Sequence, residues 1–364
     1  MSFKLWFPIL ALAVAAGLAF IVPCRSAGGG VPSISGYKVL DPIRHGNLTV
    51  FPVVAAVSHD THGFITLDEG LRTGEVVVTE SGSVQPLIRR RPRPISHDGA
   101  QVNQLVLVNN SKRPLILLAG EIVTGGKQDR VIGKDRLVPA ESDPIDLSVF
   151  CVEPGRWTGA SAQFGSLGAM GTPMAQPGVR AKAMADKDQA KVWDEVGKTR
   201  QSISVELSAP AAAAVGGTSS YARVMQNAEV QEKVDSVADP IRHSYQSLIK
   251  QLRDQNAVGA VVAVNGQIVW ADIFASTSLL EKYWPKLVRS YAAEAVVTKA
   301  KGREVDVKSA QEFLNNMEGR HETVESEPGL YRHTEIAGDG FKAFELTSLL
   351  PKTGFDLHLA KMAE

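Results

Sequence analysis

Short apolar segments separated by turn residues fill the first half of this chain and constrain its fold most. They are closely spaced and joined by glycine, asparagine and proline, a pattern typical of antiparallel sandwiches and barrels. The predicted strands cover residues 47–57, 75–79, 102–108, 114–119, 130–132, 136–139 and 145–153. Pro52 cannot donate to a ladder, so we expect the first strand at a sheet edge or a bulge. The N-terminal half is therefore predicted to be a β-rich antiparallel sandwich or barrel.

Helical periodicity and turn signals alternate in the second half. Apolar residues recur at spacings of three and four from Val230 to Leu252, and we expect Pro240 to kink or divide that helix. Asn265-Gly266 between apolar runs predicts a hairpin over residues 260–274 whose strands lie centrally in a sheet. The fold class is therefore α+β, with a mixed helix and hairpin C-terminal half.

Local capping signals place further elements. Thr66 and Glu69 form a capping box that predicts a short helix up to Gly74, and Ser278 and Glu281 form another. A further helix near residues 307–317 and a hairpin around residues 338–340 are expected to complete the chain.

Composition changes divide the chain into four predicted parts. Residues 28–157 form the β-rich part, and residues 221–364 form the α/β part, which can pack on the first as one domain. Between them, residues 158–220 are rich in Gly, Ala, Ser and Met around a short helix. Such a segment is predicted to be a mobile linker, with a lid over the β-rich half as the alternative.

The first 27 residues have the pattern of a secretory signal peptide. Lys4 precedes an apolar run from Leu5 to Val22, and small residues follow. We therefore expect a secreted or periplasmic protein, with an uncleaved N-terminal membrane anchor as the alternative. Removal of this segment takes Cys24 with it and leaves Cys151 as the only cysteine, so no internal disulfide is expected.

The overall charge limits the classes of partner. Lysine and arginine balance aspartate and glutamate, giving a formal net charge of zero. A neutral chain gives no basic surface for nucleic acid, and no membrane contact is expected beyond the N-terminal segment. The sequence names no cofactor, and a protein partner on the C-terminal helices stays open.

Polar residues beside glycine turns mark residues 115–157 as the predicted site. Gly125 and Gly126 permit close backbone approach, and Gln128 and Arg130 alternate and so share one face of a strand. The remaining candidates for the same pocket are Glu121, Glu153, Arg156 and Trp157. Arginine there suits a small anionic ligand held by a two-pronged hydrogen bond. The alternative is a buried salt-bridge network that only orders the two turns.

These same residues resemble a known family. Gly120-Glu121, the run Gly125 to Arg130, Leu137 to Ala140 and the run Cys151 to Trp157 are similar to the pattern GE…GAKQNR…LVPAG…SCVE.GRW. That pattern belongs to the ARG-and-rhodanese-phosphatase-superfamily-associated protein domain family. The chain departs from it at Gly126, Asp129, Glu141 and Phe150, and Tyr283 to Leu287 resembles the family's C-terminal part. The resemblance implies no settled reaction, and the family name associates it with phosphorylated or nucleotide-derived ligands.

A catalytic cysteine, a metal site and an ATP-binding loop have weaker support in this sequence. Cys151 lies between Phe150 and Val152 and is expected to be a buried structural cysteine. The histidines of residues 59–62 and 97–98 have no legible second ligand shell, so no metal site is predicted. The turn after residue 120 lacks the Ser or Thr that would hold magnesium in a phosphate-binding loop, which argues against ATP hydrolysis.

Three functions remain open at this point. The first is an exported binding or sensory protein with a pocket for a small anionic ligand. The second is a hydrolase acting on a phosphorylated or nucleotide-derived substrate, with Glu121 or Glu153 as general base. The third is a structural or interaction protein of the cell envelope. Binding ranks first, because no nucleophile–base pair can be read from the chain.

Overall fold

The computed structural model describes residues 36–81, 103–166, 173–298, 304–327 and 329–364. All of them belong to one compact unit, Ile34–Glu364. The predicted signal peptide (1–27), the basic run at residues 89–93 and His97-Asp98 lie outside the described residues.

One large sheet carries the first strands of the chain together with its last ones. Its order is β1-β3-β13-β14-β18-β17-β16-β15, with β2 paired to β3. The strands are β1 (Tyr37–Val39), β2 (Ile43–His45), β3 (Leu48–Ala55), β13 (Asn256–Val264), β14 (Gln267–Phe274), β15 (Gly319–Glu327), β16 (Tyr331–Gly338), β17 (Phe341–Ser348) and β18 (Asp356–Ala363). The expected hairpins at residues 260–274 and 338–340 are both present. Asn265 and Gly266 have φ of 50° and 76°, the left-handed values that their turn needs.

Pro52 lies in a strand that has neighbours on both sides. The carbonyl of Pro52 accepts from Leu40 N–H at 2.8 Å, just beyond the end of β1, while β2 pairs only with residues 48–50. In an antiparallel pair the N–H and C=O of one residue point to the same neighbouring strand. The missing N–H of Pro52 therefore faces the gap between the paired residues of β1 and those of β2. The edge alternative is corrected, whereas the bulge alternative agrees with a register shift in β13 between Ala257 and Gly259, opposite the residues that follow Pro52.

A closed barrel forms the other main element, as the short strand segments predict. Its order is β11-β6-β5-β12-β8-β9. The strands are β5 (Val76–Glu80), β6 (Gln104–Asn109), β8 (Ile122–Gly125), β9 (Arg130–Ile132), β11 (Ile145–Cys151) and β12 (Gln163–Gly165). A small sheet beside it contains β10 (Arg136–Val138), β7 (Leu115–Leu117) and β4 (Ile65–Thr66). The α+β class with a barrel in the N-terminal half is confirmed.

The helices follow local sequence signals with two corrections. They are α1 (Leu67–Thr73), α2 (Pro177–Ala181), the π-helix η4 (Lys182–Asp186), α3 (Gln189–Ser204), α4 (Ala209–Gly216), α5 (Tyr221–Gln226), α6 (Ala228–Gln251), α7 (Thr277–Val297) and α8 (Val307–Asn315). The Thr66–Glu69 capping box is present. Helix α7, however, is capped by Ser276 rather than Ser278, since the Ser276 hydroxyl accepts from Leu279 N–H at 3.0 Å. Pro240 lies inside one helix and starts no second one.

The predicted linker is built into the fold where it is described. Strand β12 completes the barrel between β5 and β8. Helix α2 and η4 bury Val179, Arg180 and Ala183, and the alanine-rich piece after residue 208 is α4. Small side chains allow close packing against the barrel's outer surface, and composition alone does not reveal that contact.

The predicted boundary after residue 157 is also crossed by the fold. Strands β1 to β3 come from the first predicted part, yet β3 pairs with β13 over residues 48–55. The two halves are therefore joined in one unit, in keeping with the alternative that they pack as one domain.

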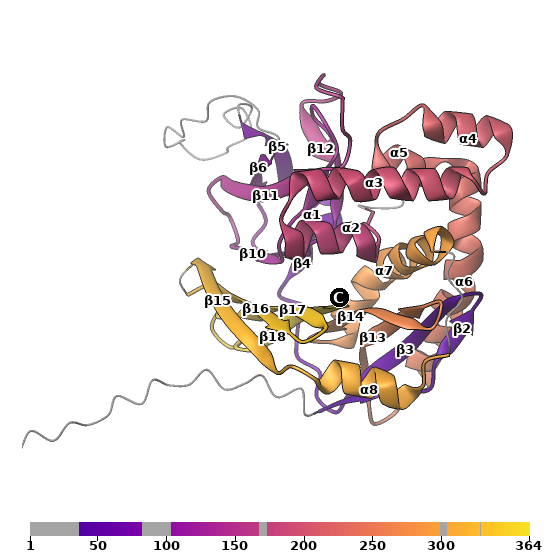
Figure 1. Cartoon of the computed structure of the whole chain (residues 1–364). Helices are drawn as coiled ribbons and strands as arrows, with labels where there is room; N and C mark the ends of the chain where they lie inside the picture. Colours follow the sequence, from indigo (N-terminus) through magenta and orange to yellow (C-terminus); the bar gives the residue numbers. More distant parts are fainter. Residues whose placement is uncertain (1–35, 82–102, 167–172, 299–303, 328) are drawn as a thin grey trace, which may run out of the picture. The chain divides into compact units, whose positions relative to one another are not determined.

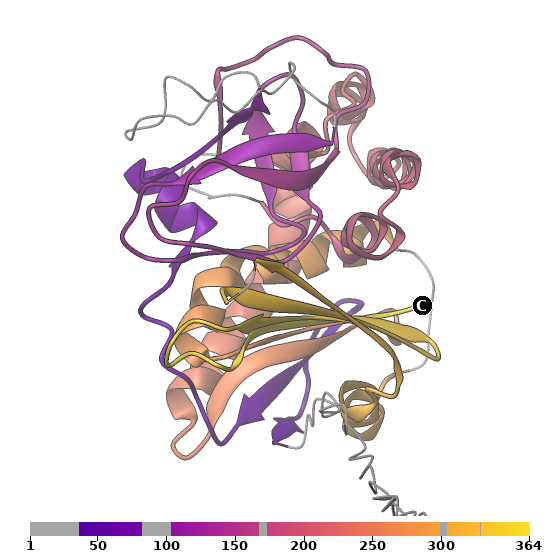
Figure 2. The same ribbon diagram turned by 90° about the vertical axis from the view of Figure 1, so that its left-hand side faces the viewer.

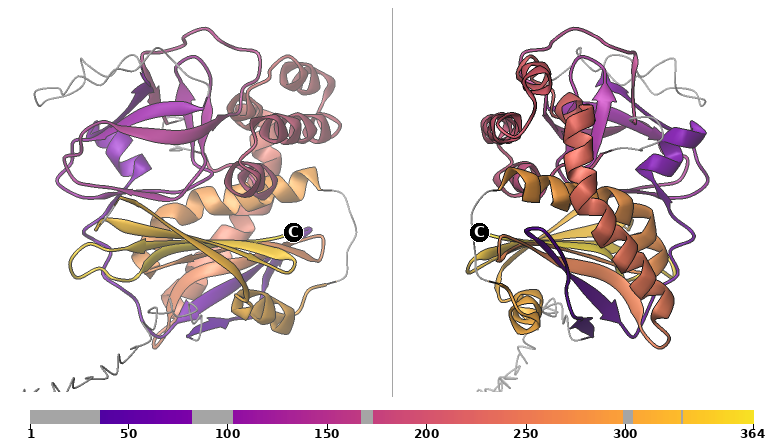
Figure 3. Two further views of the ribbon diagram at one scale, coloured as in Figure 1. Left: turned by 60° about the vertical axis from the view of Figure 1, so that its left-hand side comes forward. Right: turned by 90° about the vertical axis from the view of Figure 1, so that its right-hand side faces the viewer.

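Helix α7 lies between the barrel and the large sheet (Figures 1 and 2). Tyr283 of α7 donates its hydroxyl to the carbonyl of Ile116 in the small sheet at 3.1 Å. Helix α6 runs beside α7 and along the same face of the large sheet (Figure 3). Helix α8 covers the opposite face, where Ala310 and Leu314 pack on Phe51 and Val261. Among the described residues, no helix combines the length and the apolar character needed to cross a bilayer.

Gly259 provides a test of this packing. A Cβ built there would lie 2.1 Å from the backbone oxygen of Asp272 and 2.8 Å from Ile273 Cα. We expect Gly259→Ala to lower the free energy of unfolding by about 1–3 kcal/mol, because the two central strands must separate. Urea unfolding measures this, with Gly354→Ala as control because no atom lies within 4 Å of that Cβ. Equal stability of both variants would contradict the expectation.

Candidate functional site

The two glycine-bearing bends lie side by side at one end of the barrel. We call residues 125–130 and 153–157 together the barrel-end corner. Gln128 donates from Nε2 to the carbonyl of Glu153 at 3.0 Å, and Asp129 N–H donates to Glu153 Oε2 at 3.0 Å. The structure therefore brings together the sequence-predicted residues of these two bends.

Arg156 ties the bends to each other. Its Nη1 donates to the carbonyl of Gly126 at 3.0 Å, and its Nη2 donates to Glu153 Oε2 at 2.5 Å. Asp129 Oδ1 lies 3.6 Å from the same guanidinium. The hydrogen bond to Glu153 raises the pKa of Arg156 despite partial burial. Arg156 is thus already engaged by protein groups, as the alternative of an ordering network requires.

Asp129 links the corner to the helices that cover the barrel. Its Oδ1 accepts from Gly125 N–H at 3.1 Å, and its Oδ2 accepts from the Ser220 hydroxyl at 2.6 Å. Ser220 is also the N-cap of α5. Burial raises the pKa of Asp129 above its ordinary value. One carboxylate therefore orders both the turn and the start of a helix 91 residues away.

The double glycine is required by close packing inside the protein. A Cβ at Gly126 would lie 2.2 Å from the ring of Phe164 and 2.7 Å from Glu80 Oε1. A Cβ at Gly125 would lie 2.5 Å from the Ser161 hydroxyl. Both residues also have left-handed φ, 126° at Gly125 and 48° at Gly126. The close approach that the sequence predicted is thus made by protein side chains.

Arg130 is the buried cation of this corner. Its side chain is fully buried, with 0 % exposed, in β9 opposite Cys151 of β11. Its neighbours in the strands, Ile132 and Val149, pack in the barrel core, so alternation directs Arg130 into the same interior. Nη1 donates to the carbonyl of Gln128 at 2.8 Å. Its Nε and Nη2 have no hydrogen-bond partner within the described residues.

Further buried polar atoms of this corner and its surroundings also lack partners. Gln128 Oε1, Arg156 Nε and Glu80 Oε2 have no hydrogen-bond partner among the described residues. The other oxygen of Glu80 accepts from Lys127 N–H at 2.8 Å, and the Glu80 carboxylate acts electrostatically on Arg130. Burial lowers the pKa of Arg130, which still leaves it a cation near neutral pH. Native proteins rarely leave such atoms unpaired.

Lys127 and Trp157 lie on the exposed side of the corner. The Lys127 Nζ is 4.8 Å from the centroid of the Trp157 ring, which is 43 % exposed. This pair provides an accessible aromatic surface and a cation at the rim of the corner.

Glu121 is placed apart from these residues, under the barrel. Its Oε2 accepts from Leu118 N–H at 2.8 Å, and its Oε1 lies 2.5 Å from Lys286 Nζ of α7. Lys286 also bonds Asp68 at 2.6 Å. Burial would lower the pKa of Lys286, but the two carboxylates raise it above its ordinary value. Glu121 therefore joins helix α7 to the barrel through Lys286.

A buried chain of four charges is the main feature that the sequence did not predict. His358 Nδ1 lies 2.5 Å from Asp135 Oδ2, and its Nε2 lies 3.1 Å from Asp272 Oδ1. Asp272 also accepts two hydrogen bonds from Arg180, each of 2.9 Å, and one from the Tyr291 hydroxyl. We call Asp135, His358, Asp272 and Arg180 the buried quartet. Their side chains are at most 1 % exposed.

Charges of opposite sign alternate along the buried quartet. Burial would lower the pKa of His358, but Asp135 and Asp272 raise it to about 9. Burial opposes the charge of Asp272 as well, yet Arg180 and His358 hold the pKa of that carboxyl far below its usual range. Gly120 makes room for the Arg180 stem, because a Cβ there would lie 2.6 Å from Arg180 Cγ.

The weaker sequence candidates are also placed. Cys151 is free and buried, as expected, and burial raises the pKa of its thiol. His62 contacts only exposed Asp60, and His59 stacks on Phe355 with ring centroids 4.1 Å apart. No group of His, Cys, Asp and Glu within the described parts of the chain has the geometry of a metal site.

The comparison with protein families covers almost all of this unit. The sequence pattern of the ARG and Rhodanese-Phosphatase-superfamily-associated Protein domain matches residues 36–360. The chain belongs to this family. No curated protein and no solved structure matched it. Membership of the family confirms the resemblance but assigns no reaction to the corner or the quartet.

The quartet of this family member predicts a pH dependence of stability. His358 has a pKa of about 9 when folded and about 6.5 when unfolded, so its charged form stabilises the fold fully below pH 6.5. That contribution is lost as pH rises through 9. We expect the stability difference between wild type and His358→Gln, measured by urea unfolding, to shrink by roughly 3 kcal/mol between pH 6 and 9.5. A difference independent of pH would show that His358 is not charged in the fold.

Proposed function

We propose that this domain binds a small anion at the barrel-end corner, with Arg130 as its anchor. The observation that carries the proposal is the buried guanidinium whose Nε and Nη2 have no partner within the described residues. These two N–H groups lie on one edge of the planar guanidinium, the edge that matches two oxygens of a carboxylate or phosphate. Binding there would supply the hydrogen bonds that the protein does not.

Two acidic residues near Arg130 are committed to other groups. Glu153 accepts from Arg156 and from Asp129 N–H. Asp129 accepts from Ser220 and Gly125 N–H, whereas only one oxygen of Glu80 accepts, from Lys127 N–H. These contacts hold the carboxylates in place, which supports an external anion as the partner of Arg130.

The class of ligand is a small molecule with a carboxylate or phosphate group. Lys127 and Trp157 at the exposed rim provide a cation and an aromatic ring for the remainder of a phosphorylated or nucleotide-derived molecule. The buried anchor and the exposed rim together favour a ligand with an anionic end and a larger, partly apolar body.

Binding without catalysis is favoured over hydrolysis. Glu121 pairs with Lys286, which also pairs with Asp68, and Glu153 is held by Arg156. A general base must reach the proton that it removes, and both carboxylates are occupied by cations of the protein.

The binding role includes export, which rests on the pattern of residues 1–27. Mass spectrometry of the native protein should find its N-terminus near residue 28, and an N-terminus at Met1 would contradict cleavage.

Thermal unfolding with a ligand panel tests the anion site. We expect inorganic phosphate, acetate, a sugar phosphate or AMP to raise the melting temperature of the wild type, because a ligand bound only to the folded state stabilises it. Arg130→Gln should abolish that rise, and Arg130→Lys should weaken it because lysine keeps the charge but loses the fork. Sodium chloride at equal ionic strength controls for screening.

Arg113→Gln is the matched control, because Arg113 is exposed and remote from the contacts of the corner. Protection that is equal in wild type and Arg130→Gln would exclude Arg130 as the anchor. The absence of protection by every anion would favour the structural or interaction role. Turnover of a bound ligand that is lost in Glu153→Gln would support the hydrolase instead.

A further inference from the structure

A small open pocket lies on the large sheet, away from the barrel-end corner. Strands β15, β16 and β17 line it, and Ala185 of η4 borders it. The lining residues are Ala185, Arg320, Glu322, Glu335, Ile336, Ala337, Lys342 and Phe344. No local sequence pattern marks this pocket, because its residues come from separate strands.

The strand register sorts the charges of this pocket by sign. Arg320 is opposite Ala337, which is opposite Lys342, so two cations flank a small residue in one cross-strand row. In the next row, Glu322 is opposite Glu335, which is opposite Phe344. Directly paired residues share a face of the sheet, and rows two residues apart are separated by about 6–7 Å. A basic row and an acidic row therefore lie side by side on one face.

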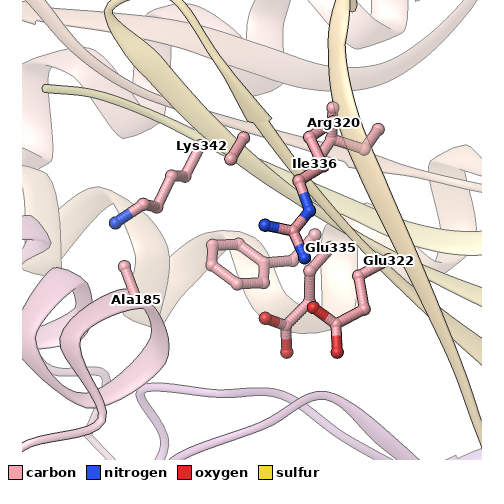
Figure 4. A pocket seen from close by; sticks show the side chains of 8 residues that line it. Ala185, Arg320, Glu322, Glu335, Ile336 and Lys342 are labelled. Atoms are coloured by element: carbon pink, nitrogen blue, oxygen red, sulfur yellow. The ribbon is translucent and has the colours of Figure 1, made fainter.

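Figure 4 shows the carboxylates of Glu322 and Glu335 close together, with the Arg320 guanidinium extending towards them. Lys342 lies on the opposite side of the pocket and extends towards Ala185. Phe344 is only 3 % exposed and provides apolar surface in the lining. Ala337 ends at Cβ, so the space between the two basic side chains is not filled by its own side chain.

Two of the four charges are available to a ligand. Lys187 donates to both oxygens of Glu335 at 2.7 and 2.8 Å, and Lys342 lies 2.9 Å from Glu364. Within the described residues, Arg320 and Glu322 are in no ion pair or side-chain hydrogen bond. Like charges directly opposite each other destabilise a sheet, and Lys187 pairs with Glu335 only, so an added cation would pair with Glu322.

We propose that this pocket binds a small zwitterion, a free α-amino acid, with its ammonium at Glu322 and Glu335. Its carboxylate then lies at Arg320 and Lys342, and its side chain lies against Phe344. A ligand of one sign would meet repulsion from one of the two rows, whereas a zwitterion complements both. The site is separate from the anion site proposed at Arg130 and does not depend on it.

Isothermal titration calorimetry and thermal unfolding with the twenty free L-amino acids test the proposal. The amino acid that binds best is then compared with its N-acetyl form, which lacks the ammonium, and its methyl ester, which lacks the carboxylate. We expect each blocked form to bind about tenfold more weakly, as for loss of one charge-assisted hydrogen bond. Arg320→Gln and Glu322→Gln should weaken binding of the free amino acid to a similar degree.

Arg332→Gln and Glu318→Gln are the matched controls. Both residues are exposed. Arg332 is an odd number of residues away from Glu335 and Ala337, so it lies on the other face of β16. Neither control should change the affinity. If no amino acid binds, if the blocked forms bind as well as the free one, or if Arg320→Gln and Glu322→Gln bind normally, the proposal is overturned.

Discussion

The buried quartet is the interaction on which the rest of the structure depends. Asp135 follows β9 of the barrel, His358 and Asp272 lie on adjacent strands of the large sheet, and Arg180 lies on α2. Four alternating charges in water-excluded surroundings neutralise one another only while all are in place. Removing one member of such a buried set leaves an uncompensated charge and costs about 3–5 kcal/mol. The barrel, the sheet and the helical segment can therefore assemble in one arrangement only.

That arrangement also fixes the backbone leading to the barrel-end corner. Arg180 packs against Gly120, and the adjoining Glu121 forms a bridge with Met174, so the segment before α2 is held on the barrel. Further along, Ser220 bonds Asp129 and caps α5, which connects the helices to the corner. The turn that carries Arg130 is thus supported from two sides. This support holds the Arg130 guanidinium in position although its Nε and Nη2 lack hydrogen-bond partners among the described residues.

Features set by neighbouring residues could be predicted from the sequence, and features set by distant partners could not. The Asn265-Gly266 turn and the Thr66 cap each depend on backbone geometry within a few residues, and both were found as expected. Asp135 and His358 are 223 residues apart, and nothing local to either marks the other. For the same reason, composition does not predict the strand and helices after residue 158, because contacts with the distant barrel strands hold them in place. Glu121 was grouped with Arg130 by proximity in sequence, but its partner Lys286 comes from α7.

The protein uses charge in two different ways, and burial distinguishes them. In the quartet and in the Glu121–Lys286 pair, each buried charge has an opposite one in contact, because an isolated charge in the interior is too costly. On the exposed face of β15 to β17, water removes that requirement, and like charges lie opposite each other in rows. Water screens such repulsion without abolishing it, so the rows keep a residual field that a molecule of matching charges can relieve. Arg130 lies between these cases, since it is buried like the quartet yet lacks a full set of protein partners. A buried cation without a full set of partners is stabilised by an anion or a water molecule that reaches it. The stability of the barrel end therefore depends on whether such a molecule is bound beside Arg130.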